Sequence, residues 1–186
     1  MNHYIVNSIN LLCLGLLFFA MKSNAQEKEY QKIESRYFNN LYQISDSIYR
    51  SEQPSRRGFT ELEEKGFKTV LNVRRLREDI KKAKHTSLKL ERIPLKAGLL
   101  SEDDLVQALQ VIHTSKKPIL IHCWHGSDRT GAIIAAYRIV VEGWEKEKAI
   151  REFRIKAFGY HEKWYPNLIE LLNNLNVQKI KTQLAI

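Results

Sequence analysis

The chain has 186 residues, 44% hydrophobic and 27% charged, which is the composition of an ordinary soluble globular protein. This length provides for one domain with a complete core and excludes a second domain of similar size. The 30 basic and 21 acidic residues give a formal net charge of +9, which favours anionic partners but equally suits a basic surface kept for solubility.

The first 25 residues have the pattern of a secretory signal peptide. The mostly apolar run from Ile9 to Met21 is too short to span a bilayer comfortably, and small residues precede a cleavage point after Ala25. We therefore expect a signal peptide at 1–25 and an exported protein, either periplasmic or secreted. Because this segment has no Arg and its only Lys is Lys22, behind the apolar run, an uncleaved membrane anchor is the alternative. A flexible polar arm is expected at 26–36, followed by one domain at 37–186.

The domain begins with short strands and helices in alternation. Alternating apolar residues predict strands at 41–44 and 48–50, separated by turn residues. A helix is expected from Ser55 to Gly66, with Phe59 and Leu62 on its buried face. The β-branched run at 67–73 predicts a buried parallel strand. A basic helical stretch at 78–85 and a strand at 88–94 follow.

The second half continues the same alternation. Ser101 opens a helix, with Asp104 completing an approximate capping box. The strand at 118–122 is the most buried in character, and a long apolar helix follows its loop and ends at Gly143. Helices around 145–156 and 166–175 close the chain. This order predicts a single α/β domain, in which a mostly parallel sheet of four or five strands has helices on both faces.

The loop from Cys123 to Arg129 joins that central strand to the long helix, and it carries the candidate chemistry. Backbone N–H groups at a helix N-terminus hold a phosphate dianion, and the same positive field favours the thiolate form of Cys123. The guanidinium of Arg129 can bind two phosphoryl oxygens and stabilise their charge. Gly126 lets the backbone curl around the anion. Thr130 can donate its hydroxyl to the sulfur.

Other residues complete the predicted site. We expect catalytic roles for four residues: Cys123, Arg129, Asp128 and Thr130. The expected substrate-binding residues are Trp124, His125, Gly126, Ser127 and Lys96. His125 is expected to point toward the pocket mouth, where a neutral spacer role is equally consistent with the sequence. No cofactor and no metal are expected. After removal of the leader, Cys123 is the only cysteine, so an internal disulfide is excluded.

The segment His122–Gly131 resembles the HCxxGxxRTG signature of the protein-tyrosine-phosphatase superfamily, and it matches every fixed position. The size and the segment Tyr49–Pro54 resemble the atypical dual-specificity branch of bacteria, plants and fungi, over about residues 38–175. The resemblance implies hydrolysis of phosphoesters through a phosphocysteine intermediate. Inositol phosphates or phosphoinositides are the favoured substrates, and phosphoproteins are the alternative. We also expect no nucleic-acid partner and a monomer, with peripheral contact to an anionic membrane surface as an option.

The general acid is where the family pattern breaks. In the relatives an aspartate precedes the helix that opens here at Ser101, but Lys96 and Ala97 fall at its place. The nearest acids, at 102–104, lie in the first helical turn, where complementing the helix dipole explains them; Asp103 or Asp104 is a secondary candidate. Asp128 resembles the loop aspartate of myotubularin-like lipid phosphatases. It is expected either to protonate the leaving group or to brace the loop.

Two further hypotheses compete with the assignment as a phosphatase. One is a non-catalytic module that binds anions with the same loop. The other is a sulfur-transfer or arsenate-reducing enzyme, which also uses a Cys-to-Arg loop but usually needs resolving cysteines. His161 falls in a helix–helix connection that reaches the rim of the site in the relatives, and a structural role is favoured for it.

Overall fold

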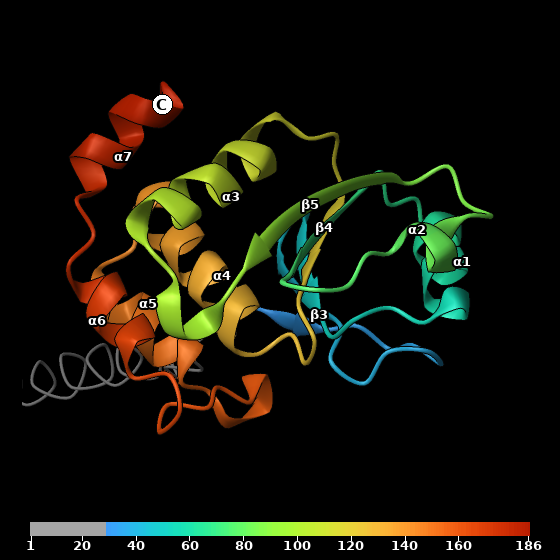
Figure 1. The fold of residues 1–186 in the computed structure, drawn as a ribbon, viewed down its shortest axis with the longest axis horizontal. Helices are drawn as coiled ribbons and strands as arrows, with labels where there is room; N and C mark the ends of the chain where they lie inside the picture. Colours follow the sequence, from blue (N-terminus) through green and yellow to red (C-terminus); the bar gives the residue numbers. More distant parts are fainter. Residues whose placement is uncertain (1–28) are drawn as a thin grey trace, which may run out of the picture.

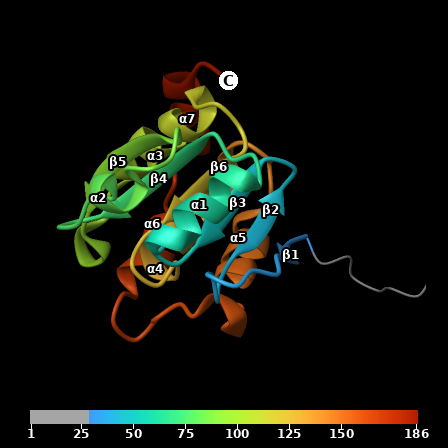
Figure 2. The ribbon, with the colours of Figure 1, turned by 90° about the vertical axis from the view of Figure 1, so that its right-hand side faces the viewer.

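A six-stranded sheet lies at the centre of the computed structural model, which describes residues 29–186 (Figure 1). Figure 2 shows the strands in the order β1-β2-β3-β6-β4-β5. β3 (Ile48–Ser51), β6 (Ile119–His122), β4 (Thr69–Arg74) and β5 (Lys89–Leu95) are parallel. β1 (Gln31–Lys32) and β2 (Tyr42–Ser45) extend one edge in antiparallel fashion. The predicted α/β class is confirmed. The sheet has six strands, where four or five were expected.

The additional strand comes from the segment expected to be a flexible arm. β1 pairs with β2, and the Ile33 N–H donates to the Leu41 carbonyl at 2.9 Å. The Tyr30 ring packs edge-on against Phe158, with 4.8 Å between ring centroids. Backbone pairing and aromatic contact thus hold the described part of the arm against the domain. The predicted signal peptide at 1–25 lies outside the described residues.

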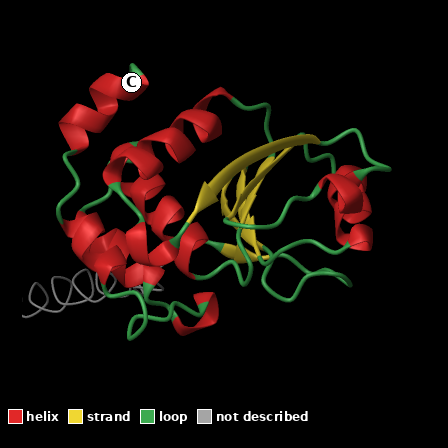
Figure 3. Ribbon diagram, in the orientation of Figure 1, coloured by secondary structure: helices red, strands yellow, loops and turns green. Residues whose placement is uncertain are grey.

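Helices cover both faces of the sheet, as Figure 3 shows. One face carries α1 (Arg56–Glu64) and α2 (Ile80–Ala83). The other carries α3 (Glu102–Thr114), α4 (Asp128–Val140), α5 (Lys146–Phe153), α6 (Asn167–Asn173) and α7 (Val177–Leu184). Successive side chains of β6 point to opposite faces of the sheet. Leu120 packs into the core under α1, while Ile119 and Ile121 pack into the larger core around α4. Two short 3-10 turns, η1 (Ala97–Leu99) and η2 (Lys156–Phe158), complete the chain.

Local capping explains where the predicted helices begin. The Ser55 hydroxyl accepts from the Gly58 N–H at 3.0 Å at the start of α1. Ser101 and Asp104 form the expected capping box of α3. α7 was not predicted. Within residues 29–186, no helix has the length and apolar character needed to cross a membrane.

Parallel pairing brings three strand ends to one edge of the sheet. His122, the last residue of β6, lies beside Ser51 of β3 and Asn72 of β4. The loop after β6 therefore emerges between the segments that follow β3 and β4. In open α/β sheets, the carboxyl ends of such strands are where ligands bind.

Candidate active site

Cys123, the predicted nucleophile, directly follows β6 and is a buried free cysteine, 2% exposed. The preceding His122 is completely buried, and its Nε2 lies 2.7 Å from Asp79 Oδ2. Burial opposes ionisation of Asp79, but hydrogen bonds with His122 and Gln53 hold the pKa of its carboxyl below the ordinary value. A buried carboxylate–imidazole pair therefore supports the strand end from which the thiol emerges.

Arg50 holds the outer side of the phosphate-binding loop. Its Nη2 donates to the Gly126 carbonyl at 2.6 Å and to the Ser127 carbonyl at 3.5 Å. The guanidinium lies 4.1 Å from the centroid of the Phe158 ring, and only 2% of the residue is exposed. Burial lowers the pKa of Arg50 to about 10, against the opposing charges of Glu152 and Cys123. The side chain thus remains a charged donor fixed behind the loop.

Two further donors bind the remaining carbonyls of the loop from outside. The Gln53 N–H donates to the Trp124 carbonyl at 3.0 Å. Asn40 Nδ2 donates to the His125 carbonyl at 3.3 Å. Both donors belong to segments beside β3, and Asn40 is itself held because its N–H donates to Glu52 at 3.0 Å. Every carbonyl from Trp124 to Ser127 is therefore occupied on the side away from the pocket.

The N–H groups of the same loop are free. From Trp124 to Arg129, no backbone N–H has a hydrogen-bond acceptor within the described chain. Gly126 adopts φ +75°, and a Cβ there would lie 2.4 Å from the Ser51 carbonyl oxygen, so only glycine fits. Consecutive free N–H groups at a helix N-terminus form an anion-binding cradle. The residues predicted to bind substrate through this loop are thus brought together around Cys123.

Arg129 extends from the first turn of α4 into the pocket. Its Nη1 donates to the Leu95 carbonyl at 3.3 Å, while its buried Nε has no partner among the described residues. The Thr130 hydroxyl is also buried without a partner there, so the expected hydrogen bond to the Cys123 sulfur is not formed in this structure. A catalytic role for Thr130 stays a prediction.

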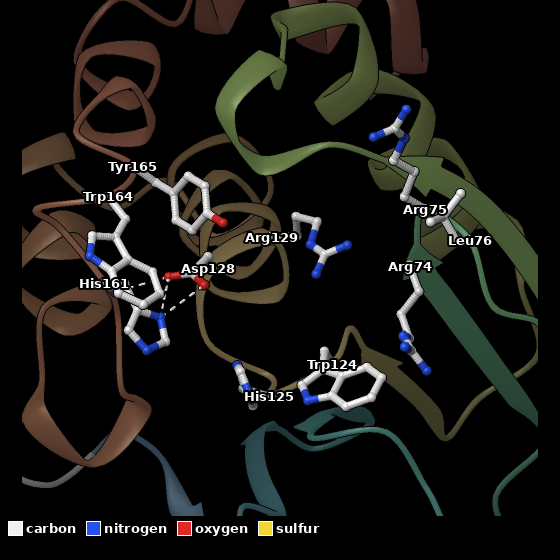
Figure 4. Close-up of a pocket in the computed structure, with 10 residues that line it drawn as sticks. All are labelled: Arg74, Arg75, Leu76, Trp124, His125, Asp128, Arg129, His161, Trp164 and Tyr165. Atoms are coloured by element: carbon white, nitrogen blue, oxygen red, sulfur yellow. Dashed lines mark hydrogen bonds and ion pairs between the residues drawn. The ribbon is translucent and has the colours of Figure 1, made fainter.

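The pocket above the loop has a volume of about 380 Å³ and two different walls (Figure 4). One wall follows β4, where the Arg74 guanidinium lies 4.1 Å from the Trp124 ring centroid and donates to Gln53 Oε1. The other wall comes from the connection between η2 and α6. The lining residues are Arg74, Arg75, Leu76, Trp124, His125, Asp128, Arg129, His161, Trp164 and Tyr165.

Arg74 and Arg75 were not identified from the sequence. Their signal was present, because two arginines directly follow a predicted parallel strand and so reach the same sheet edge as Cys123. Lys96, which was expected to contact the anion, is exposed at the start of η1 and is not among the lining residues. The pocket therefore receives its additional positive charge from the end of β4.

Asp128 points toward the second wall and is bound there by one residue. Its Oδ1 accepts from the His161 N–H at 2.9 Å, and the two carboxyl oxygens lie 3.1 and 3.0 Å from His161 Nδ1. These bonds join the loop to the connection before α6. The bracing role considered for Asp128 is thus realised, and its role as acid stays a prediction.

The alternative acids upstream are engaged elsewhere. Asp104 accepts from the Ser101 N–H at 3.0 Å within the capping box. Glu102 lies 2.8 Å from Lys179 Nζ and accepts from the Asn176 N–H. Asp103 is exposed, and none of the three lines the pocket. Within residues 29–186, no cluster of His, Cys, Asp or Glu is arranged to hold a metal ion.

Known proteins are similar to this chain in sequence and in fold. Dual specificity protein phosphatase TpbA of Pseudomonas aeruginosa is 31% identical over 123 residues, covering 64% of this chain and 56% of TpbA. Inositol diphosphatase DSP5 of Arabidopsis thaliana is 27% identical over 157 residues, covering 76% of this chain and 72% of DSP5. The crystal structure of TpbA superposes with a TM-score of 0.76 at 25% identity, covering 87% of this chain and 99% of that one. The chain spans about half the length of the full TpbA sequence.

A family model gives the assignment. The model described as "DSP-PTPase phosphatase fused to NAD+ Kinase" matches residues 26–164, which include the whole loop and both walls of the pocket up to Trp164. The chain therefore belongs to this family of DSP-PTPase phosphatases.

Proposed function

We propose that the protein is a cysteine-dependent phosphatase that hydrolyses phosphoesters through a phosphocysteine intermediate. The observation that carries this proposal is the cradle of free N–H groups from Trp124 to Arg129 around the buried thiol of Cys123. Three phosphoryl oxygens are held by these donors and by the Arg129 guanidinium, so the phosphorus is presented to the sulfur. A non-catalytic anion-binding module would not need a nucleophile at the centre of the cradle.

The reaction proceeds in two displacements. The Cys123 thiolate attacks phosphorus, the S–P bond forms, and the bond to the leaving oxygen breaks as that oxygen takes up a proton. Water then attacks phosphorus, the S–P bond breaks, and inorganic phosphate is released. Arg129 and the loop N–H groups stabilise the charge on the equatorial oxygens in both steps. The proton donor is proposed to lie on the Asp128 side of the pocket, because the acids at 102–104 do not line it.

For the substrate we propose a densely anionic molecule, an inositol phosphate or phosphoinositide. Three arginines line the pocket: Arg74, Arg75 and Arg129. Its one carboxylate, that of Asp128, is already bound by His161. Such a lining favours several phosphate groups over one. The relative DSP5 is named an inositol diphosphatase, which supports the same choice.

The alternative substrate is a phosphoprotein. Trp124 and Trp164 flank the pocket with exposed indoles, which could stack on a phosphotyrosine ring. A crystal structure of a TpbA variant in complex with phosphotyrosine has a TM-score of 0.75 at 26% identity. The two hypotheses differ in whether the arginines or the two indoles of the pocket dominate binding.

Export and a monomeric state complete the proposal. The apolar run at 9–21 and the small residues before position 26 support cleavage after Ala25 and release into the periplasm or the medium. N-terminal sequencing of the protein recovered from cell fractions tests this, and an intact N-terminus in a membrane fraction would contradict it. Light scattering tests the monomer, and vesicle co-sedimentation tests peripheral binding to anionic lipid.

A phosphate-release panel tests the function. Phosphopeptides, phosphoinositides, inositol polyphosphates and nucleotides are compared by kcat/KM, with Cys123→Ser as the control. We expect the highest kcat/KM for the inositol compounds and a preference that weakens as salt rises, because screening removes long-range attraction. Faster turnover of phosphopeptides would select the alternative, and activity retained by Cys123→Ser would exclude the mechanism.

A further inference from the structure

We propose that His161, rather than Asp128, donates the proton to the leaving oxygen, and that Asp128 is the residue that positions its ring. This inference rests on the proposed function and identifies the general acid of that reaction. It starts from the contacts between the two residues, because both oxygens of Asp128 face donors of His161. An aspartate engaged in this way is placed to act as an acceptor.

The geometry selects one tautomer of the His161 ring. With Nδ1 as the donor to Asp128 at 3.0 Å, the other ring nitrogen, Nε2, is the one left to exchange a proton. Nε2 has no hydrogen-bond partner among the described residues. A carboxylate on one nitrogen orients an imidazole and stabilises its protonated form, which is the arrangement that a general acid requires.

The ring is also held in place at the pocket mouth. It stacks on Trp164 with 5.3 Å between ring centroids and an angle of 15°. The His161 carbonyl accepts from the N–H groups of Trp164 and Tyr165 at 3.0 and 3.1 Å, which closes a turn. His161 lines the pocket, and its side chain is 38% exposed (Figure 4). The imidazole is therefore both accessible to substrate and fixed in orientation.

In-line attack places the leaving oxygen on this side. Cys123 is buried at the start of the loop, so in an in-line attack the leaving oxygen points away from the buried sulfur, toward the open pocket that His161 lines. The other histidine of the lining, His125, has no carboxylate partner, and its ring centroid lies 5.8 Å from that of His161. Besides Asp128, the remaining charged or titratable groups that line the pocket are Arg74, Arg75, Arg129 and Tyr165.

The proton balance follows from the two displacements. In the first, the S–P bond forms, the P–O bond breaks, and the proton on Nε2 moves to the leaving oxygen, which departs as an alcohol. The neutral imidazole then accepts a proton from the attacking water as the new P–O bond forms and the S–P bond breaks. His161 thereby regains the proton on Nε2, and Asp128 takes no part in the transfer.

The test compares two variants on two substrates. His161→Asn keeps an amide donor at the position of Nδ1 and so preserves the bond to Asp128, but it has no group that can carry the proton. We expect about a 10²-fold loss of kcat with phenyl phosphate and a far smaller loss with para-nitrophenyl phosphate, whose oxygen leaves without help. The alkaline limb of the kcat profile should disappear with phenyl phosphate. His113→Asn, the same change at an exposed position of α3, is the matched control.

Asp128→Asn separates positioning from donation. If Asp128 positions the ring, this variant keeps the alkaline limb and the dependence on the leaving group, because His161 still carries the proton, while kcat falls with the lost orientation of the ring. Loss of the limb in Asp128→Asn together with its retention in His161→Asn would overturn the proposal and make Asp128 the acid. Equal losses of His161→Asn on both substrates would also overturn it. Failure of the proposed function is distinct, since Cys123→Ser would then still turn over para-nitrophenyl phosphate.

Discussion

The base and the rim of the pocket are built by different means. The base is the loop from Cys123 to Arg129, whose carbonyls are bonded from behind by Arg50, Gln53 and Asn40. The rim is made of side chains from other segments, with the buried Arg74 stacked on the exposed Trp124 and the partly exposed His161 stacked on the exposed Trp164. The base therefore binds the phosphoryl group that every substrate shares, while the rim contacts what is attached to it. Changes in the base should affect all substrates alike, and changes in the rim should separate them.

The largest effect is expected at the centre of the base. Cys123→Ser should abolish turnover of every substrate while retaining phosphate binding, because the cradle of N–H groups stays intact. Arg129→Ala should lose both, because the guanidinium contributes to binding and to transition-state charge. Turnover by single-turnover kinetics and phosphate binding by calorimetry measure the two quantities. Retention of more than a few per cent of activity by Cys123→Ser would contradict the division of roles.

A slightly smaller loss is expected from the support behind the loop. Arg50→Met removes the donor to the Gly126 and Ser127 carbonyls and leaves the Gly126 oxygen unpaired in a buried site, whereas the Ser127 oxygen still accepts from the Gly131 N–H. We expect kcat to fall by about 10²-fold on aryl phosphates and inositol phosphates alike, the scale of losing oxyanion donors. Arg36→Met, at an exposed position, is the matched control.

Stability must be measured on the same variant, because the change is buried. A loss of about 2 kcal/mol in the free energy of unfolding is expected from the broken charged hydrogen bonds. Urea titration gives this value, and assays are run where the variant remains folded. A loss of kcat that differs between substrates would show that Arg50 also affects contacts at the rim. It would contradict the expectation that changes in the base affect all substrates alike.

The base was largely predictable from the sequence, whereas at the rim His125 and His161 were expected and the arginines were missed. The predicted roles of Cys123 and Arg129 follow from their short spacing between a buried strand and a helix, a local pattern. Arg74 and His161 reach the pocket only through parallel pairing of β4 with β6 and through the turn before α6. Contacts between segments so far apart in the chain produce no periodic pattern in the local sequence from which they could be predicted. The same reason explains why β1 was missed, since two residues of edge strand carry no detectable alternation.

A rim substitution should separate substrates where base substitutions do not. Arg74→Ala removes one cation and the stacking partner of Trp124. We expect KM for an inositol polyphosphate to rise by about 10-fold, the scale of about 1.4 kcal/mol of lost binding, with little change for para-nitrophenyl phosphate. The difference between the KM changes for the two substrates should become smaller as the salt concentration rises. Lys116→Ala, an exposed site remote from the pocket, is the control. Equal changes of KM on both substrates would place Arg74 in the base.

The smallest effect on catalysis, and a measurable one on stability, is expected from the layer beneath the base. Asp79 is 4% exposed and accepts from Gln53 Nε2 at 3.1 Å, while its other oxygen faces His122. Because its folded-state pKa lies below the ordinary value of 3.8, folding favours the ionised carboxyl. The contribution of the ionised carboxyl to the free energy of unfolding is therefore complete above the ordinary pKa, and it is lost as the pH falls through the folded-state pKa. Asp79→Asn should lower the free energy of unfolding by about 2 kcal/mol at neutral pH. The gap to the wild type should narrow as the pH is lowered below about 4. Urea titrations at several pH values measure this gap. A gap that stays constant into strong acid would mean that packing around the side chain, and not its ionised hydrogen bonds, supports the strand end below Cys123.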